Sequence, residues 1–129
     1  MHVRHGESKG LGHAVLKARP IIGELPFVVV SPDVIVDDVS ADLKPENLSA
    51  MLTRYYEVGH SQIMVEPVPM EMVSNYVVAD CAGHELAAGE SKAMTAVGRY
   101  VLSEKVWDML EFTPPGAGDE IHLLMLLLA

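Results

Sequence analysis

The chain has 129 residues, of which 50% are hydrophobic and 21% charged, so it has enough apolar material for one folded domain and is not a disordered chain. Its formal net charge of −9 argues against a nucleic-acid surface, because binding a phosphate backbone needs clustered Lys and Arg. A small phosphate ligand is still compatible with this charge, since backbone N–H groups and a divalent cation can hold it.

Cys81 is the only cysteine, which rules out an intrachain disulfide and fits a reducing cytoplasm. No apolar signal core follows Met1. The apolar tail, residues 123–129, is far shorter than the roughly 20 residues of a membrane span. We therefore expect a cytoplasmic protein with no membrane partner.

Segments of helical and strand character alternate along the chain, which predicts an α/β fold. A short helix over residues 14–18 is expected to end at Pro20. The apolar, β-branched run at residues 27–30 predicts a strand buried on both faces, as in a parallel sheet, and residues 34–36 extend it.

The clearest helix is predicted over residues 45–58. Its apolar face comprises Leu48, Met51, Leu52 and Tyr55, which are spaced at helical intervals. Gly59 is a natural stop for this helix.

The second half continues the alternation, with strands expected over residues 61–68, 76–80 and 97–102, a helix through residues 106–110 and a last helix from about residue 119. Pro67 and Pro69 are expected to end the first of these strands. Ser103 is a candidate N-cap for the helix that follows it.

Two glycines, Gly10 and Gly12, stand at a junction between a loop and a helix. Glycine lets the backbone approach a ligand closely, and a helix start supplies N–H groups that have no partner within the helix. The alternative interpretation is a tight turn before a surface helix, and this pattern alone does not decide between the two.

Asp33 directly follows the most apolar strand. In open α/β sheets ligands bind beyond the carboxyl ends of strands, and a carboxylate there can hold Mg²⁺, which prefers oxygen ligands. A turn aspartate after Pro32 is the alternative. The six histidines are scattered and show no zinc-ligand spacing.

The order of five segments along the chain is more informative than any single segment. They are KGLGHAVL (residues 9–16), PFVVVSPDVIVD (26–37), GHSQIMVEPV (59–68), VGRYVL (97–102) and TPPGAGDEI (113–121). The series closely resembles the bacterial UTP–glucose-1-phosphate uridylyltransferase family over residues 3–121.

The resemblance implies one incomplete domain, residues 1–129, with a Rossmann-like nucleotidyltransferase fold and a mixed, mainly parallel sheet. It implies that UTP and glucose 1-phosphate are converted to UDP-glucose and pyrophosphate with Mg²⁺, in a homo-oligomer. Carried over by position, Gly10, with Gly12 beside it, faces the uracil, and Asp33 binds the metal. His5 stands where the family has a glutamine that contacts uracil, and Val77 stands where a glycine lines the sugar side.

The family's N-terminal glycine-rich loop, with its arginine and lysine for the triphosphate, has no counterpart here. Neither has a Val-Glu-Lys-Pro segment, because residues 94–96 run directly into residue 97. The catalytic basic residues therefore stay unassigned. We expect the sequence to be a partial reading of a longer chain, and an intact mass near 14.0 kDa would contradict this.

Two other functions stay open at this stage, and so does a structural fragment that binds no ligand. A related nucleotidyltransferase with a different sugar or base is one, because His5 and Val77 alter both ends of the pocket. A non-catalytic nucleotide-binding or assembly module of the same fold is the other, and the missing basic residues favour it. These residues by themselves are expected to be inactive.

Overall fold

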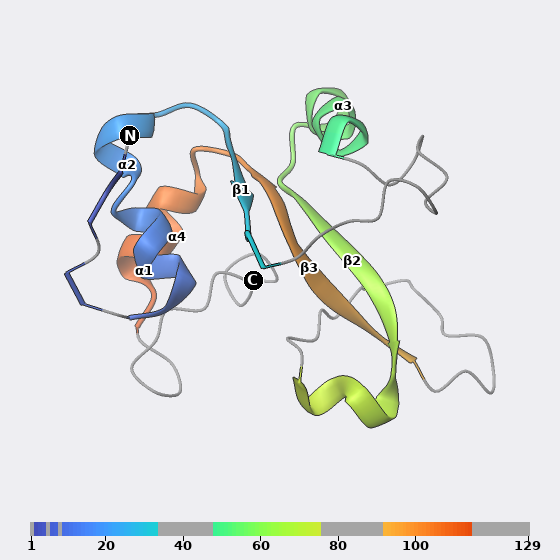
Figure 1. The fold of residues 1–129 in the computed structure, drawn as a ribbon. Helices are drawn as coiled ribbons and strands as arrows, with labels where there is room; N and C mark the ends of the chain where they lie inside the picture. Colours follow the sequence, from blue (N-terminus) through green and yellow to red (C-terminus); the bar gives the residue numbers. More distant parts are fainter. Residues whose placement is uncertain (1, 5, 8, 34–47, 76–91, 115–129) are drawn as a thin grey trace.

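The computed structural model describes residues 2–4, 6–7, 9–33, 48–75 and 92–114 (Figure 1). In chain order the elements are α1 (Gly10–Leu16), α2 (Arg19–Ile22), β1 (Phe27–Val30), α3 (Leu48–Val58), β2 (Gln62–Pro69), the 3₁₀-helix η1 (Met70–Asn75), β3 (Lys92–Leu102) and α4 (Val106–Phe112). Helices and strands are thus combined as the α/β prediction requires. The strand predicted at 76–80, the strand extension at 34–36 and the last helix lie outside the described residues.

The described strands form one sheet in the order β1-β3-β2, with β3 in the centre. Both ladders are antiparallel, from Phe27 opposite Leu102 to Val30 opposite Arg99 on one side of β3, and from Gln62 opposite Val101 to Pro69 opposite Lys92 on the other. The predicted mainly parallel sheet is therefore not seen among these strands. β1 and β2 do run in the same direction, but β3 separates them.

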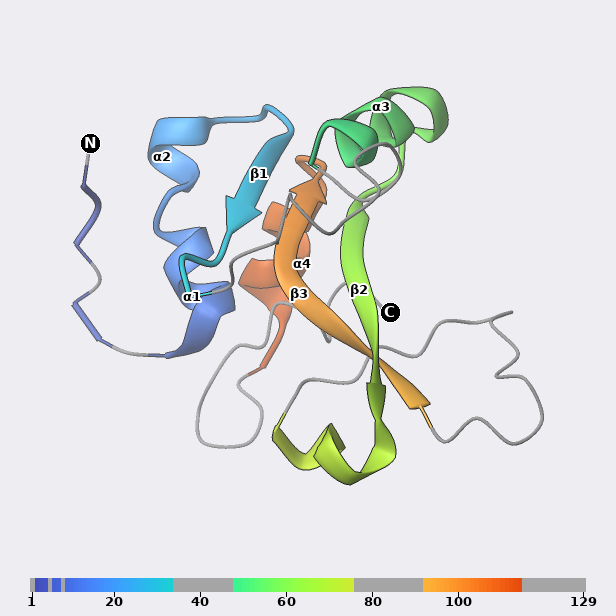
Figure 2. The same cartoon turned by 45° about the vertical axis from the view of Figure 1, so that its right-hand side comes forward.

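Helices α1, α2 and α4 gather on one side of the sheet, and α3 lies apart from them, near the start of β2 (Figures 1 and 2). Helix η1 follows β2 at its opposite end. Within the described part of the chain, no helix is long and apolar enough to cross a membrane.

Strand β1 was expected to be buried on both faces, and this is wrong. Its burial alternates: Phe27 and Val29 pack against the core, whereas Val28 and Val30 are 37% and 48% exposed. The helices cover one face only, so the period of two along a strand decides which side chains are buried.

Proline has a different role here from the predicted one at two positions. Pro67 lies inside β2, opposite Met94, whereas Pro69 is the last residue of the strand, as predicted. Among the described strands β2 is an edge, where a residue without an N–H group is tolerated. Pro20 begins α2 at its first turn, which suits a residue that has no N–H to donate.

The predicted Ser103 side-chain cap is also wrong, because no side chain caps α4 and Lys105 is at the N-cap position. The Ser103 carbonyl accepts from the Val106 N–H at 3.2 Å. Its own N–H donates to Ser61 Oγ at 3.1 Å, so Ser103 joins the start of β2 to the end of β3.

The predicted amphipathic helix is confirmed from Leu48 to Val58, and residues 45–47 lie outside the described residues. Its predicted apolar face is half-buried. Gly59 ends the helix with φ +69°, and its N–H donates to the Tyr55 carbonyl at 2.8 Å. A positive φ is what makes glycine suitable after a helix.

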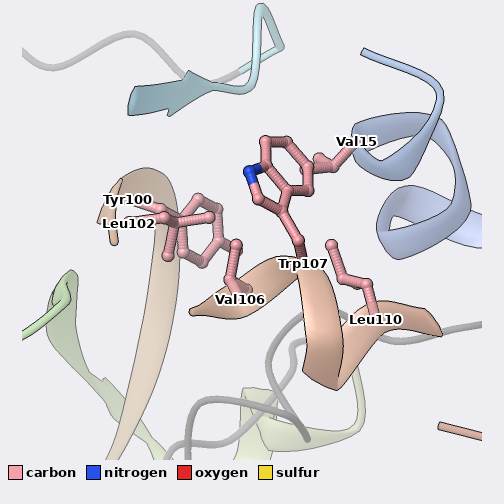
Figure 3. Close-up of a cluster of buried hydrophobic side chains, with 6 residues drawn as sticks. All are labelled: Val15, Tyr100, Leu102, Val106, Trp107 and Leu110. Atoms are coloured by element: carbon pink, nitrogen blue, oxygen red, sulfur yellow. The ribbon is translucent and has the colours of Figure 1, made fainter. Parts of the chain in front are cut away.

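The core lies between the sheet and the helices α1 and α4 (Figure 3). Its buried members are Val15, Tyr100, Leu102, Val106, Trp107 and Leu110. Leu102 and Trp107 have no exposed surface, although the chain is rich in partly exposed apolar side chains. The end of β3 and the first two turns of α4 therefore form the best-packed part of the described fold.

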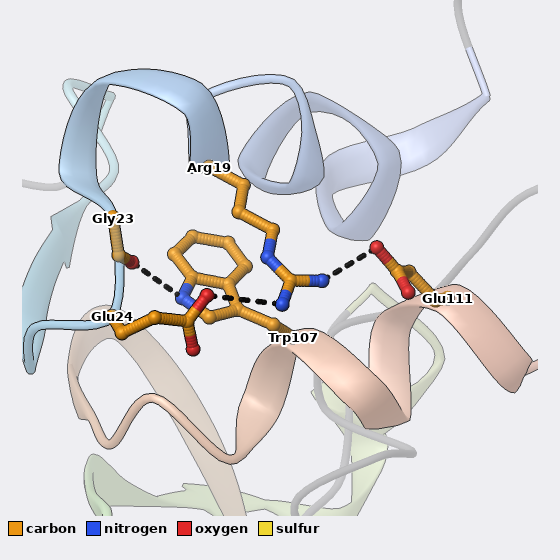
Figure 4. Close-up of polar contacts among 5 residues, drawn as sticks. All are labelled: Arg19, Gly23, Glu24, Trp107 and Glu111. Carbon is orange, nitrogen blue, oxygen red and sulfur yellow. Dashed lines mark hydrogen bonds and ion pairs between the residues drawn. The ribbon is translucent and has the colours of Figure 1, made fainter.

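Trp107 holds three segments together (Figure 4). Its ring stacks on Phe27 of β1, with centroids 4.5 Å apart and planes at 8°. The indole N–H donates to the Gly23 carbonyl at 3.0 Å. Arg19 of α2 lies 6.0 Å from the ring centroid, within the range of a cation–π contact.

Arg19 also pairs with Glu24 at 3.0 Å and with Glu111 of α4 at 2.5 Å (Figure 4). The hydrogen bond with Glu24, together with the pairing to Glu111, raises the pKa of Arg19 above its ordinary value. These charges sit at the surface, so we attribute the stability of this corner mainly to the Trp107 packing.

We predict that Trp107→Ala lowers the free energy of unfolding by about 3–5 kcal/mol, because it leaves a cavity in the core. Trp107→Phe keeps a ring on Phe27 but leaves a smaller cavity and removes the donor to the Gly23 carbonyl, so the loss should be smaller, about 1–3 kcal/mol. Urea unfolding of the full-length protein, followed by far-UV circular dichroism, measures both. Equal losses in the two variants would contradict the assigned packing role.

Gly59→Ala should cost about 1 kcal/mol of stability, because an L side chain is strained at a positive φ. A Cβ at Gly59 would meet nothing within 4 Å, so crowding cannot account for such a loss. Gly6 is the matched control, since it also has open space but no positive φ. Thermal unfolding measures the stability of Gly59→Ala and Gly6→Ala. An equally small loss of stability at both positions would refute the backbone argument.

Candidate nucleotide-binding site

The turn after β1 carries the candidate metal ligand. Ser31 donates its N–H to the Gly98 carbonyl of β3 at 2.8 Å. Arg99 Nη1 donates to the Ser31 carbonyl at 3.1 Å. Both polar backbone groups of Ser31 are thus fixed to β3, and Asp33 stands two residues further on with an exposed side chain.

The β2–β3 ladder is irregular beside this attachment. Ile63 pairs with Tyr100 and Val65 with Ala96, so β3 carries extra residues opposite Met64. Gly98, which lies in this bulge, is buried and has φ +66°. On the other side of β3, the hydrogen bond from Ser31 to Gly98 continues the β1–β3 ladder by one residue beyond the Val30–Arg99 pair.

Strand β3 runs without interruption through residues 94–97, where the family resemblance predicted missing residues. The ladder is regular through residues 94–96, and its irregularity follows at residues 97–99. The chain thus continues as one strand across the junction.

The two glycines lie inside α1, which spans Gly10–Leu16 instead of the predicted residues 14–18. Gly10 is half-buried and has φ +83°, a conformation that disfavours other residues. Lys9 precedes it and pairs with Glu7 at 2.8 Å, and the hydrogen bond from Lys9 lowers the pKa of Glu7. Gly10 therefore has no side chain of its own to cover its backbone.

Gly12 is placed differently from Gly10. It is buried with Val15 on one face of α1, and Val15 belongs to the core that includes Trp107. Residues three apart share a helix face. Packing against the core is therefore a sufficient reason for glycine at position 12.

Gly10 and Asp33 belong to different elements but to the same region of the fold. In Figures 1 and 2 the turn after β1 lies level with α1 and nearer to it than to α3 or η1. Helix α1, which begins at Gly10, and the turn that carries Asp33 therefore do not lie at opposite ends of the described structure.

The donor chemistry of the turn suits Mg²⁺ bound together with a phosphate ligand. Within the described ranges no three His, Cys, Asp or Glu side chains come close enough to form a metal cage. Mg²⁺ commonly uses one or two carboxylates and completes its coordination with water and substrate phosphates. The exposed Asp33 carboxylate fits that arrangement better than it fits a structural metal site.

Two predicted site residues, His5 and Val77, lie outside the described residues, so their roles stay predictions. Sequence reasoning overlooked Arg99, whose hydrogen bond fixes the Asp33 turn. An arginine in the middle of a predicted strand was the available signal, because a cation in a half-buried strand needs an acceptor.

Comparison with known proteins supports the class of fold that these features indicate. No protein-family model matches the chain. The chain is 52% identical to the UTP–glucose-1-phosphate uridylyltransferase of Haemophilus influenzae and 51% identical to that of Escherichia coli K12. Each alignment covers 95% of this chain and 47% or 45% of the relative, so the chain spans about half the length of the curated relatives it matches.

Solved structures of UDP-glucose pyrophosphorylases also resemble the chain. An apo UDP-glucose pyrophosphorylase matches 99% of this chain and 50% of its own, with a TM-score of 0.77 and 29% identity. UDP-glucose pyrophosphorylase from Acinetobacter baumannii matches with a TM-score of 0.75 and 34% identity, over 98% of this chain and 47% of its own.

The fold is therefore that of part of a sugar-nucleotide-forming nucleotidyltransferase. Within that class, the chain belongs to the bacterial UTP–glucose-1-phosphate uridylyltransferase family, over about half the length of its members. The family that the sequence motifs suggested is thus confirmed.

The buried hydroxyl of Tyr100, next to Arg99, predicts how the stability of the fold depends on pH. Burial raises the pKa of its hydroxyl above the ordinary value of 10.0. Below pH 10 the group is neutral in both states; above it the unfolded chain ionises first, so stability falls as pH rises towards the folded-state pKa. Tyr100→Phe should flatten this fall, which begins near pH 10, as measured by urea unfolding, whereas Tyr56→Phe, at a side chain 79% exposed, should not.

Proposed function

We propose that this chain acts in the synthesis of UDP-glucose from UTP and glucose 1-phosphate, with release of pyrophosphate. The observation that carries the proposal is the 52% identity to a uridylyltransferase over 95% of the chain, combined with a fixed turn that presents Asp33. Among the similar solved structures, one UDP-glucose pyrophosphorylase is UTP-bound and another is complexed with UDP-glucose, which supports both ligands.

In the proposed reaction an oxygen of the sugar phosphate forms a bond to the α-phosphorus of UTP. The bond from that phosphorus to the oxygen bridging to the β-phosphate breaks, and pyrophosphate leaves. Such transfers depend mainly on positioning and on neutralising phosphate charge, so a protein can promote them with few reacting side chains.

Asp33 is the proposed metal ligand. Mg²⁺, when bound, would supply the positive charge that brings phosphates to a chain of net charge −9. The carboxylate of Asp33 would hold that ion near the carboxyl end of β1. The two hydrogen bonds at Ser31 keep the turn in place before any ligand binds, so less ordering is needed on binding.

Gly10 and His5 are proposed to face the uracil, and Val77 the glucose. At Gly10 a Cβ is absent and φ is positive, so the backbone can approach a ring closely. Gly12 would contribute by setting the packing of α1, as its burial indicates. A histidine can exchange only one hydrogen bond per ring nitrogen with the base, so uracil preference would rest on the backbone as much as on His5.

The finer description of the fold is part of the proposal. No described strand pairs with the outer edge of β1, and the curated relatives are about twice as long as the chain. A mainly parallel, Rossmann-like sheet would result if further strands added beside β1. A cytoplasmic homo-oligomer is proposed on the family resemblance alone.

A non-catalytic nucleotide-binding module is the second candidate. The alignment with relatives runs over 139 positions, more than the 129 residues of the chain, so the relatives carry residues within the matched stretch that this chain lacks. Losing part of a catalytic apparatus while keeping the turn and glycines would leave binding without turnover. UDP-glucose binding without pyrophosphate release would support this candidate over the first.

We predict that Asp33→Asn in the full-length protein lowers Mg²⁺-dependent uridylyltransferase activity by at least about 100-fold, because it removes the charge that holds the metal. The measurement is pyrophosphate release from UTP and glucose 1-phosphate across a Mg²⁺ titration. Asn is nearly isosteric, so thermal stability should change little.

Asp108→Asn is the matched control, since Asp108 is an exposed aspartate in the first turn of α4. It should leave activity within about twofold, as expected of a surface substitution. Unchanged activity in Asp33→Asn would remove Asp33 from the site, and equal losses in both variants would show a nonspecific effect.

A further inference from the structure

Arg99 bridges the central strand and the turn that carries Asp33. We propose that Arg99 is a positioning residue: its guanidinium holds the turn so that the Asp33 carboxylate keeps the geometry that a Mg²⁺-bound nucleotide needs. This inference rests on the proposed function, and it assigns a role to a residue of β3 that does not itself touch the metal.

Three hydrogen bonds meet at this point. Arg99 Nη1 donates to the Ser31 carbonyl at 3.1 Å and to the Gly98 carbonyl at 3.3 Å. The Ser31 N–H donates to the same Gly98 carbonyl at 2.8 Å. The guanidinium therefore closes a small network that includes the peptide group leading from Ser31 towards Asp33.

The ladder explains why this position can reach the turn. Arg99 lies directly opposite Val30, the last residue of β1, so its backbone stands beside the point where the turn begins. The positive φ of Gly98 bends β3 at the preceding residue. Arg99 is half-buried, and a charged donor in that setting forms a stronger hydrogen bond than a neutral one.

Removing the guanidinium would not detach the turn. The Ser31 N–H bond to Gly98 belongs to the backbone and stays available, and the strand pairing from Phe27 to Val30 does not involve the Arg99 side chain. What is lost is the hold on the Ser31 carbonyl, and with it the orientation of the following residues. Removal of the guanidinium should therefore weaken metal binding more than it lowers the stability of the fold.

Arg99→Met tests this inference, because methionine retains an unbranched apolar side chain and removes every donor. Arg99→Lys retains a charged donor, but its ammonium sits on a more flexible stem without the planar guanidinium whose Nη1 reaches both carbonyls. Arg54→Met is the matched control: Arg54 lies on α3, has a 64% exposed side chain and pairs with Glu57 at 3.6 Å.

The experiment measures Mn²⁺ binding to the full-length protein in the presence of UTP, by electron paramagnetic resonance. The Mg²⁺ concentration for half-maximal pyrophosphate release and the melting temperature are recorded for the same samples. Loss of a residue that orients a metal ligand typically weakens metal binding 10–100-fold, so Arg99→Met should weaken Mn²⁺ binding about tenfold. Arg99→Lys should fall between Arg99→Met and the unsubstituted protein, and Arg54→Met should match the latter.

A fall in melting temperature for Arg99→Met, with unchanged Mn²⁺ binding and Mg²⁺ dependence, would overturn the inference and leave Arg99 a structural residue. If Arg99→Met does not fold, Arg99→Lys decides by the same two metal measurements. Failure of the proposed function is distinguishable: Asp33→Asn would then leave Mn²⁺ binding unchanged. A large effect of Asp33→Asn with none of either Arg99 variant would sink only the positioning role.

Discussion

The described structure depends on the position of β3 between β1 and β2. Both ladders use β3, and no other described strand joins the two edges. Its last residues, Tyr100 and Leu102, enter the core beside Trp107 of α4. The same strand, at Gly98 and Arg99, fixes the turn that follows β1. One strand thus couples the best-packed part of the fold to the candidate metal ligand.

Trp107 completes that coupling from the helical side. By stacking on Phe27 and bonding to the Gly23 carbonyl, it sets the position of β1 relative to α4 and of the loop that precedes β1. Because Val15 of α1 belongs to the same cluster, the glycine turn at Gly10 is anchored through this core as well. The two candidate binding elements are therefore held by a common set of buried contacts.

Two of the few basic side chains in this acidic chain have specific structural roles. Arg19 pairs with two glutamates over the Trp107 ring, and Arg99 bonds to backbone carbonyls beside the candidate metal site. A chain with 18 acidic and only 9 basic residues has little positive charge of its own for a triphosphate. Uridylyltransferase activity in this setting would require a divalent cation, and it would also require basic groups beyond those assigned here.

The sequence by itself determined the family, the strand at Phe27–Val30, the amphipathic helix that ends before Gly59 and the presence of a short helix at the glycine turn. These features follow from local rules, since hydrophobic period, helix-stop chemistry and motif order act over a few residues each. The sequence also singled out Asp33 as a residue of the turn that follows an apolar strand.

Only the tertiary structure decided which face of β1 is buried, that Pro67 lies within an edge strand, and that Ser103 bonds to Ser61 Oγ instead of capping α4. It alone revealed that Arg99 holds the Asp33 turn. Each depends on a partner far away in the chain, 68 residues away for Arg99 and Ser31, and no local pattern encodes such a partner. Pairing across the sheet, which brings distant residues together, is the physical reason for the difference.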